Sequence, residues 1–335
     1  MNPTQTADLA VVGAGPTGLY AAYCAGLRGL RPVLIDSMQT PGGQVAALFP
    51  DKHIYDAAGF PEVTGSELVQ RLVAQAQSAS PTYMLNRVAT HLTGPEGGPF
   101  TLILDTAESV QARAVLITAG VGGFRPRPFP AGTGWEGRGL EHTVTDHGQY
   151  LDQDVVVVGG GDSAVDWALH LEPTARSVCL VHRRPRLRAH KASQNALAAS
   201  TVEVHLSAQV TEIRGDSCVQ EVVVTPAQGE PWRRPVQRIV AALGFLADLG
   251  PILGWGLDTQ ERRLLVDATM QTSFPGIYAA GDVAQLPGKI RLLTVGFAEA
   301  AIAVNHIASR LEPGASVFPG HSTDRPRVDV QAPVP

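Results

Sequence analysis

The chain has 335 residues, 44% of them hydrophobic and 17% charged, and a formal net charge of −5. This length predicts two domains, and the composition is typical of a soluble globular protein. Because nucleic-acid-binding domains are usually strongly basic, the acidic balance argues against a nucleic-acid partner. Residues 1–30 lack the basic start of a signal peptide, and the apolar stretch 239–256 is too interrupted for a membrane span. We therefore expect a cytoplasmic protein with no membrane segment.

The three cysteines, Cys24, Cys179 and Cys218, are far apart in the sequence. None belongs to a C-x-x-C pair, so we expect neither a dithiol redox centre nor a metal site. Cys24 and Cys179 fall in apolar segments, where a cysteine usually behaves as a small buried apolar side chain. Cys218 lies in a polar turn.

The first strong motif follows a strand predicted over residues 9–12. It reads Gly13-Ala-Gly15-Pro-Thr-Gly18 and opens a helix rich in alanine and leucine. In this G-x-G-x-x-G fingerprint the first glycine allows a tight turn, the second lets the backbone approach a pyrophosphate, and the third lets helix and strand pack closely. A second predicted strand, 32–36, ends in Asp36, whose carboxylate can bind a ribose hydroxyl.

Weaker signals follow the first fingerprint. The loop Gly42-Gly-Gln44 has a backbone that can lie against a flat ligand and an amide that can donate and accept hydrogen bonds, although simple loops show the same pattern. Ser66 is predicted to cap a helix running to residue 76. The passage 122–139 is rich in glycine, proline and arginine, which is typical of a crossing between domains. Other strands are predicted at residues 100–104, 114–118, 202–207, 219–225 and 236–240.

A second fingerprint makes the chain a repeat of two dinucleotide-binding units. Strand 155–158 leads into Gly159-Gly-Gly161-Asp-Ser-Ala164, which opens a helix predicted over residues 162–171. The next strand, 178–181, ends in His182-Arg183-Arg184 and not in a carboxylate, with Arg188 close behind. Guanidinium groups bind a 2′-phosphate that a carboxylate would repel. The alternative interpretation of these arginines is a solvated basic surface.

The C-terminal part offers two further features. A predicted strand from residue 274 ends in Gly281-Asp282, which could place Asp282 beside the first nucleotide, although a plain strand and turn explains the pattern equally well. The last helix is predicted over residues 294–311, and its positive N-terminal end can stabilise an anion on a bound ligand.

Together these motifs resemble the flavoproteins with two dinucleotide sites that include thioredoxin reductase. Thioredoxin reductases carry C-x-x-C just ahead of the second fingerprint, but the corresponding segment here, 140–150, contains no cysteine. The chain more closely resembles the thioredoxin-reductase-like ferredoxin–NADP(+) reductases, from Asp8 to about Thr323. Besides the two fingerprints, that resemblance rests on residues 42–50, 54–61, 182–190 and 321–323.

The resemblance implies an α/β fold of two Rossmann-like, three-layer ββα domains, with the NADP domain inserted in the FAD domain. The expected FAD domain comprises residues 1–119 and 246–335, and the expected NADPH domain residues 120–245. Such an enzyme binds FAD, takes a hydride from NADPH onto flavin N5, passes single electrons to ferredoxin or flavodoxin, and forms a homodimer. Crossings near Gly120 and Gly244 would provide a hinge for domain rotation.

The resemblance also implies site residues. For FAD these are Gly13, Gly15, Pro16, Thr17, Gly18, Asp36, Gly43, Gln44, Phe49, Val88, Phe124, Asp282, Thr294, Val295 and Thr323. For NADP they are Gly159, Gly161, Asp162, Ser163, His182, Arg183, Arg184 and Arg188. Phe49 and His321 would stack on opposite faces of the flavin, with His321 acting across a dimer interface, and no acid or base side chain is required. Two departures from the family are Phe49, where Tyr is common, and Asp36, where Glu is common.

Other functions use the same motifs. An NADPH oxidase that reduces O₂ or quinone needs the same two cofactors. A low-molecular-weight disulfide reductase would need a reactive cysteine, which the first fingerprint lacks. A non-catalytic flavin redox sensor would not need to retain the arginines that follow the second fingerprint. Docking an acidic ferredoxin needs a locally basic face, and the candidates for it are Lys52, Arg125, Arg127, Lys289 and Arg291.

Overall fold

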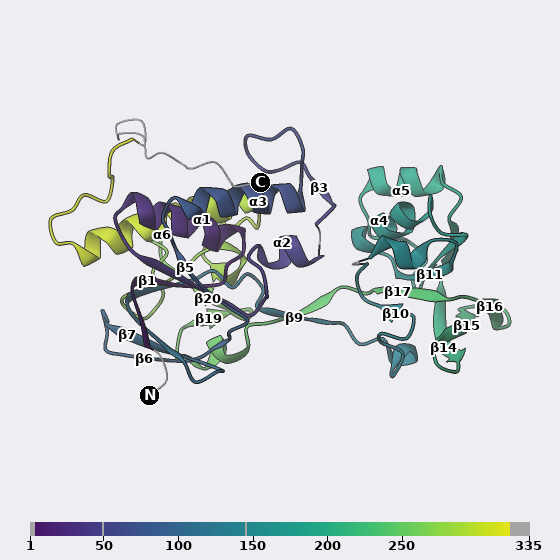
Figure 1. Ribbon diagram of the computed structural model, residues 1–335. Coiled ribbons are helices and arrows are strands. Elements are labelled where there is room, and N and C mark those ends of the chain that lie inside the picture. Colours follow the sequence, from purple (N-terminus) through teal and green to yellow (C-terminus); the bar gives the residue numbers. More distant parts are fainter. Residues whose placement is uncertain (1–3, 49, 145, 322–335) are drawn as a thin grey trace. The chain divides into compact units, whose positions relative to one another are not determined.

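The computed structural model describes residues 4–48, 50–144 and 146–321, leaving out the side chains of residues 124, 125 and 247 (Figure 1). The chain divides into two compact units, Met1–Gly123 with Ala247–Pro335, and Phe124–Leu246. The expected boundaries were 119/120 and 245/246. Strands β9 (Gly123–Pro126) and β18 (Phe245–Asp248), which carry the chain from one unit to the other, pair with each other.

The first unit is built on a seven-stranded sheet in the order β5-β2-β1-β8-β7-β6, with β21 also paired to β8. Its strands are β1 (Thr4–Val12), β2 (Pro32–Asp36), β5 (Thr82–Leu85), β6 (Ala89–Thr93), β7 (Phe100–Leu104), β8 (Ser109–Ile117) and β21 (Ile277–Ala279). The pairs among β5, β2, β1, β8 and β21 are parallel, whereas β7 and β6 add antiparallel edges.

Two layers cover this sheet, which explains why its central strands are apolar on both faces. Leu9 and Val11 of β1 pack with helices α1 (Pro16–Leu27), α3 (Gly65–Gln77) and α6 (Leu293–Leu311). Ala10 and Val12 pack on the other side, in the cluster that includes residues of η3 (Gly250–Gly254) and of a small sheet. That sheet comprises β19 (Thr259–Gln260), β20 (Arg263–Leu265) and β22 (Ala284–Gln285). The remaining short elements are α2 (Gly43–Leu48), β3 (His53–Ile54), β4 (Val63–Thr64) and η4 (Gly281–Val283).

The second unit repeats the plan with three layers of its own. A parallel sheet runs in the order β10-β17-β11-β12-β13, formed by β10 (Leu140–Glu141), β11 (Asp154–Gly159), β12 (Ser177–His182), β13 (Glu203–Leu206) and β17 (Arg238–Ala242). Helices α4 (Asp162–Leu171) and α5 (Lys191–Ala198) cover one face. The antiparallel sheet of β14 (Ala208–Gly215), β15 (Val219–Pro226) and β16 (Trp232–Pro235) covers the other. Two short turns, η1 (Pro130–Gly132) and η2 (His147–Tyr150), precede β11. The α/β, three-layer prediction is therefore confirmed.

Several element boundaries differ from the prediction. Helix α3 begins at Gly65, and its N-cap is Thr64, whose Oγ1 accepts a hydrogen bond from Glu67 N at 3.3 Å. The predicted cap at Ser66 is wrong because Thr64, at the end of β4, already has the extended backbone that an N-cap needs. Helix α6 begins at Leu293, and not at Thr294. Within the described ranges, no helix combines the length and the apolar run that crossing a bilayer requires.

Candidate functional site

The first fingerprint forms the turn from β1 into α1. A Cβ on Gly18 would lie 1.9 Å from the carbonyl oxygen of Gly13, so only glycine lets α1 pack this closely on the turn. Among the described residues other than its chain neighbours, the atom nearest to a Cβ on Gly15 would be the Gly43 Cα, at 3.9 Å. Gly15 is the N-cap of α1 and supplies no side-chain hydrogen bond to the first turn. An open approach to a helix N-terminus fits the diphosphate of a dinucleotide.

Asp36 closes the other side of this turn. Its Oδ2 accepts a hydrogen bond from Ala14 N at 2.6 Å, and its Oδ1 accepts one from Met38 N at 2.9 Å. Burial raises the pKa of the Asp36 carboxyl, and the two N–H donors oppose that rise. Each oxygen keeps a second lone pair for a ribose hydroxyl. The Arg87 N–H donates to the Asp36 carbonyl at 2.9 Å, which places the neighbouring Val88 beside the end of β2.

The Gly42-Gly-Gln44 loop lies directly against the fingerprint. Gly42 N donates to Ala14 O at 2.8 Å, and a Cβ on Gly43 would be only 3.0 Å from the Gly15 Cα. The two glycines thus allow backbone to pack on backbone. Gln44 lies close to Gly120, since a Cβ on Gly120 would be 3.2 Å from the Gln44 Nε2. Two of the predicted FAD positions, Gly43 and Gln44, are therefore gathered with Gly15 at one end of the sheet.

The C-terminal part of the unit reaches the same place. Cβ atoms on Gly281 and Gly296 would lie 2.9 and 2.7 Å from the Thr17 Oγ1, so Thr17 of the fingerprint contacts both η4 and the start of α6. Asp282, half-buried, makes no side-chain hydrogen bond to any residue that the structure describes. Thr294 donates through Oγ1 to Asp56 O at 3.1 Å, so its hydroxyl already has a partner.

Two charged side chains that the motifs did not assign to this site meet beside Gly281. Lys289 Nζ lies 2.5 Å from Glu299 Oε1, and the two side chains are 2% and 6% exposed. The expectation that Lys289 helps to dock an acidic partner is wrong, because its ammonium group is buried against Glu299. A signal for Glu299 was present in the sequence: it lies on the buried stripe of α6 together with Gly296, Ala300 and Ala303.

The second fingerprint has the same openness in the second unit. Among the described residues other than its two chain neighbours, no atom lies within 4 Å of a Cβ placed on Gly161, the N-cap of α4. Asp162 Oδ1 accepts from His190 N at 2.8 Å, and Arg188 N donates to Gly160 O at 2.7 Å. These two bonds fold the 183–190 loop back onto the fingerprint.

The His182 side chain packs against the second fingerprint. A Cβ on Gly160 would lie 2.3 Å from the imidazole Nδ1 of His182, so the ring packs directly against the glycine backbone. Burial lowers the pKa of His182, and the Arg183 and Arg188 charges lower it further, whereas a hydrogen bond to the backbone of Arg186 opposes the fall. The imidazole is buried, and its Nε2 has no hydrogen-bond partner among the described residues.

The arginines of the loop remain available to a ligand. Arg183, Arg184 and Arg188 are exposed, and none pairs with a carboxylate in the described part of the chain. Unpaired guanidinium groups next to an open fingerprint fit the 2′-phosphate of NADP(H), because a phosphate supplies the anion that the protein does not. Ser163 follows Asp162 in the first turn of α4 and is half-buried.

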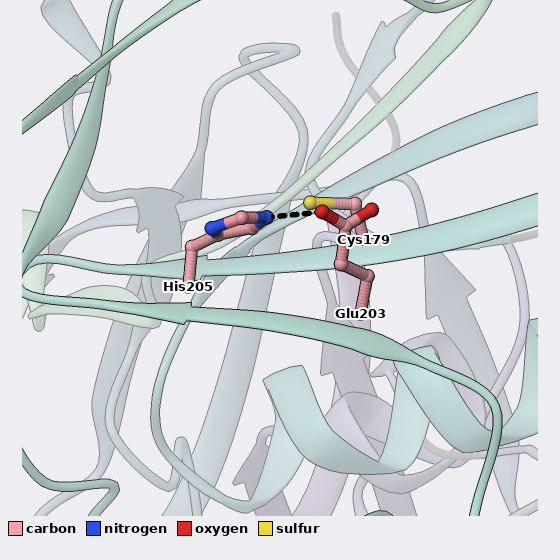
Figure 2. A group of neighbouring side chains, drawn as sticks. All are labelled: Cys179, Glu203 and His205. Carbon is pink, nitrogen blue, oxygen red and sulfur yellow. Dashed lines mark hydrogen bonds and ion pairs between the residues drawn. The ribbon is translucent and has the colours of Figure 1, made fainter. Parts of the chain in front are cut away.

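Cys179, Glu203 and His205 gather on one face of β12 and β13, with their ligand atoms within 4.8 Å of one another (Figure 2). Glu203 already accepts from Arg234 Nη1, and its Oε1 lies 2.6 Å from His205 Nε2. Burial raises the pKa of the Cys179 thiol to about 12, so the sulfur is protonated at neutral pH. A metal ion would have to displace these bonds beside the positive charge of Arg234. Hydrogen bonding within the protein thus accounts for the cluster.

Some predicted residues fall outside the described ranges. Phe49 and Thr323 belong to this group, as does the side chain of Phe124. His321 is exposed, and its ring centroid lies 5.3 Å from that of Phe318. The segment before it is held by Arg28, which donates to Ser316 O at 2.8 Å and to Val317 O at 3.2 Å.

Comparisons with known proteins agree with this geometry. The family of pyridine nucleotide-disulphide oxidoreductases matches residues 7–304. A ferredoxin–NADP reductase of Nocardioides sp. is 54% identical over 96% of this chain and 99% of its own. One from Saccharopolyspora erythraea is 54% identical over 95% of this chain and 97% of its own. Among solved structures, the T. acidophilum thioredoxin reductase matches in fold, with a TM-score of 0.78 at 24% identity, covering 91% of this chain and 98% of that one.

Fold and site together define a pyridine nucleotide-disulphide oxidoreductase with one dinucleotide fingerprint in each unit. Within that class the chain belongs to the ferredoxin–NADP reductase family, the prediction made from its motifs. It is an FAD-dependent oxidoreductase that uses NADP(H). The likeness to thioredoxin reductase is one of fold, and the sequence contains no C-x-x-C pair.

Proposed function

We propose that the protein passes electrons from NADPH through FAD to ferredoxin or flavodoxin, and that it works in the cytoplasm as a homodimer. The contrast between the residues near the two fingerprints is the observation that assigns FAD to one unit and NADPH to the other. Asp36 ends β2 in the first unit, whereas unpaired arginines follow β12 in the second. A carboxylate accepts ribose hydroxyls and guanidinium groups bind a 2′-phosphate. FAD therefore belongs to the first unit and NADPH to the second.

FAD supplies the chemistry when bound, since it accepts a hydride and releases electrons singly. The chain binds and orients the reactants. The open N-terminus of α1 receives the diphosphate of FAD, and Asp36 the adenosine ribose. Asp282, whose carboxylate has no partner among the described residues, receives hydroxyls of the ribityl chain. The N-terminal end of α6 is aimed at negative charge on the flavin ring.

No side chain of this site needs to act as acid or base. Phe49 and His321 are assigned to the two faces of the flavin, where they would exclude water and position the nicotinamide. Arg28 holds residues 316 and 317 against the end of α1. The segment that leads to His321 is therefore anchored four residues before it. We infer that His321 serves the flavin of a partner subunit.

The proposal is tested by steady-state reduction of cytochrome c by the purified yellow protein, with and without added ferredoxin. Marked stimulation by ferredoxin, with NADPH strongly preferred over NADH, supports it. Rapid flavin bleaching by NADPH without ferredoxin stimulation points instead to an oxidase or quinone reductase. Flavin that NADPH does not reduce leaves only a binding or sensing role. Sedimentation of the same preparation at the mass of a monomer would exclude the homodimer.

A further inference from the structure

The Lys289–Glu299 pair forms a closed ring of hydrogen bonds around the backbone of one residue, Gly281. Lys289 Nζ lies 2.5 Å from both oxygens of Glu299 and donates to Gly281 O at 2.9 Å. Glu299 Oε2 in turn accepts from Gly281 N at 2.8 Å. Both polar groups of the Gly281 backbone are therefore held by one ion pair, which is almost fully buried.

A stabilising role alone does not explain this arrangement. Burying two charges costs much of what their attraction returns, and well-packed apolar replacements are often as stable or more so. The three protons of the Lys289 ammonium group have three acceptors here, so the geometry is complete. Such a fully satisfied polar network specifies one arrangement of the groups that it joins.

The ring of hydrogen bonds joins three parts of the first unit. Gly281 precedes Asp282 in η4, Lys289 lies in the loop before α6, and Glu299 lies in the second turn of α6. Gly281 also contacts Thr17 of the fingerprint, because a Cβ on it would lie 2.9 Å from Thr17 Oγ1. A shift of Gly281 would thus move Asp282 and the first turn of α6 away from the fingerprint together.

We propose that the Lys289–Glu299 ion pair is a positioning device for FAD: it fixes Gly281 so that Asp282 and the N-terminus of α6 face the cofactor. Neither side chain needs to touch FAD. The inference rests on the proposed function only in placing FAD in the first unit. It implies that FAD retention depends on the pair even where the stability of the fold does not.

The experiment compares three variants of the holoenzyme: Lys289→Met, Glu299→Met and the double variant. Release of FAD is followed by the rise in free-flavin fluorescence after dilution, and unfolding by circular dichroism with excess FAD. Each single variant leaves a buried unpaired charge and lowers the melting temperature. The double variant recovers most of that loss because no unpaired charge remains. It nevertheless releases FAD at least about tenfold faster than the unmodified protein, a change equivalent to about 1.4 kcal/mol.

A matched control is the exposed pair of Arg71 and Glu67 on α3, 2.7 Å apart. Arg71→Met with Glu67→Met should leave FAD release unchanged. Hydrogen exchange of the 277–296 peptide should quicken only in the Lys289 and Glu299 variants. If the double variant releases FAD less than about tenfold faster, or if the Arg71 control accelerates release equally, the proposal is overturned.

The same preparations separate this inference from the proposed function. An unmodified protein that binds FAD but does not reduce ferredoxin refutes the acceptor, while rapid FAD loss from the double variant still supports the positioning role. Full ferredoxin reduction by the unmodified protein, combined with unchanged FAD release from the double variant, refutes the positioning role alone. If the single variants do not fold, the double variant carries the test.

Discussion

Replacing Gly15 by alanine should weaken FAD binding while sparing the fold, whereas replacing Gly18 should weaken the fold itself. The Gly18 Cβ would lie 1.9 Å from Gly13 O, a separation that real Cβ atoms essentially never show, so α1 must move away from the turn. Overpacking of this kind costs about 1–3 kcal/mol. For a unit of this size each kcal/mol lowers the melting temperature by about 2–4 °C, which gives roughly 2–12 °C.

The Gly15→Ala variant meets no such obstacle. Its Cβ would be 3.9 Å from the Gly43 Cα, and the backbone at Gly15, with φ of −71°, is open to any residue. The cost to the helix is about 1 kcal/mol or less, because alanine is a poorer N-cap than glycine. The methyl group instead occupies the space expected for the diphosphate. Losing two charge-assisted hydrogen bonds costs about 3 kcal/mol, which corresponds to about 100-fold in the Kd for FAD.

The assay is equilibrium binding of FAD by fluorescence quenching, paired with thermal unfolding in the absence of added FAD. Gly254→Ala is the control, because in the described part of the chain only its sequence neighbours lie within 4 Å of the new Cβ, and its backbone is not left-handed. Tight FAD binding by the Gly15→Ala variant would refute the placement of the diphosphate. A Gly18→Ala variant that melts like the unmodified protein would refute the packing argument.

Three further predictions concern the second unit and the C-terminal segment. Arg183→Ala with Arg184→Ala should raise the KM for NADPH at least about tenfold and leave that for NADH almost unchanged, because two phosphate contacts are lost; steady-state kinetics with an artificial acceptor measure both. The lowered pKa of buried His182 means that the unfolded chain binds a proton that the folded chain does not. Stability of the second unit is therefore full above pH 6.5 and falls as the pH drops through 6.5 towards the folded pKa; melting curves of His182→Asn should lose that slope. Arg28→Met should speed hydrogen exchange of residues 312–318, since the carbonyl of Ser316 loses its donor.

Each of these has a result that would count against it. Equal losses for NADPH and NADH would mean that the two arginines bind no 2′-phosphate. An unchanged pH slope in His182→Asn would assign the acid sensitivity to another group. For Arg28→Met the control is Arg31→Met, which removes an exposed partner of Asp8 from the same end of α1; equal exchange in both variants would show that Arg28 does not hold the segment.

Much of the fold could be predicted because its signals are local. Strand 32–36 and helix 162–171 have the predicted ends. An apolar run marks the strand, and the second fingerprint marks the start of the helix. The cap of α3 was misplaced because two hydroxyl residues, Thr64 and Ser66, lie two positions apart and only the strand before them decides between the two. A local pattern thus predicts that a hydroxyl residue caps the helix, but it does not decide which of two nearby hydroxyl residues is the cap.

The Lys289–Glu299 pair shows what local patterns leave out. Glu299 on an apolar helical stripe is a visible anomaly, but nothing in a loop of glycine and proline marks Lys289 as its partner. The pairing depends on where the chain brings the loop after β22, which is a long-range property. For the same reason Lys289 was predicted to be a docking cation: charge is visible in the sequence, and burial is not.

We propose that this protein carries electrons from NADPH to ferredoxin through FAD. The most direct test is stopped-flow mixing of the reduced holoenzyme with oxidised ferredoxin, after stoichiometric reduction by NADPH under anaerobic conditions. We expect flavin absorbance to return while ferredoxin absorbance is lost, at a rate that rises with ferredoxin concentration. Flavin that stays reduced in the presence of ferredoxin, but reoxidises on adding O₂ or quinone, would contradict it.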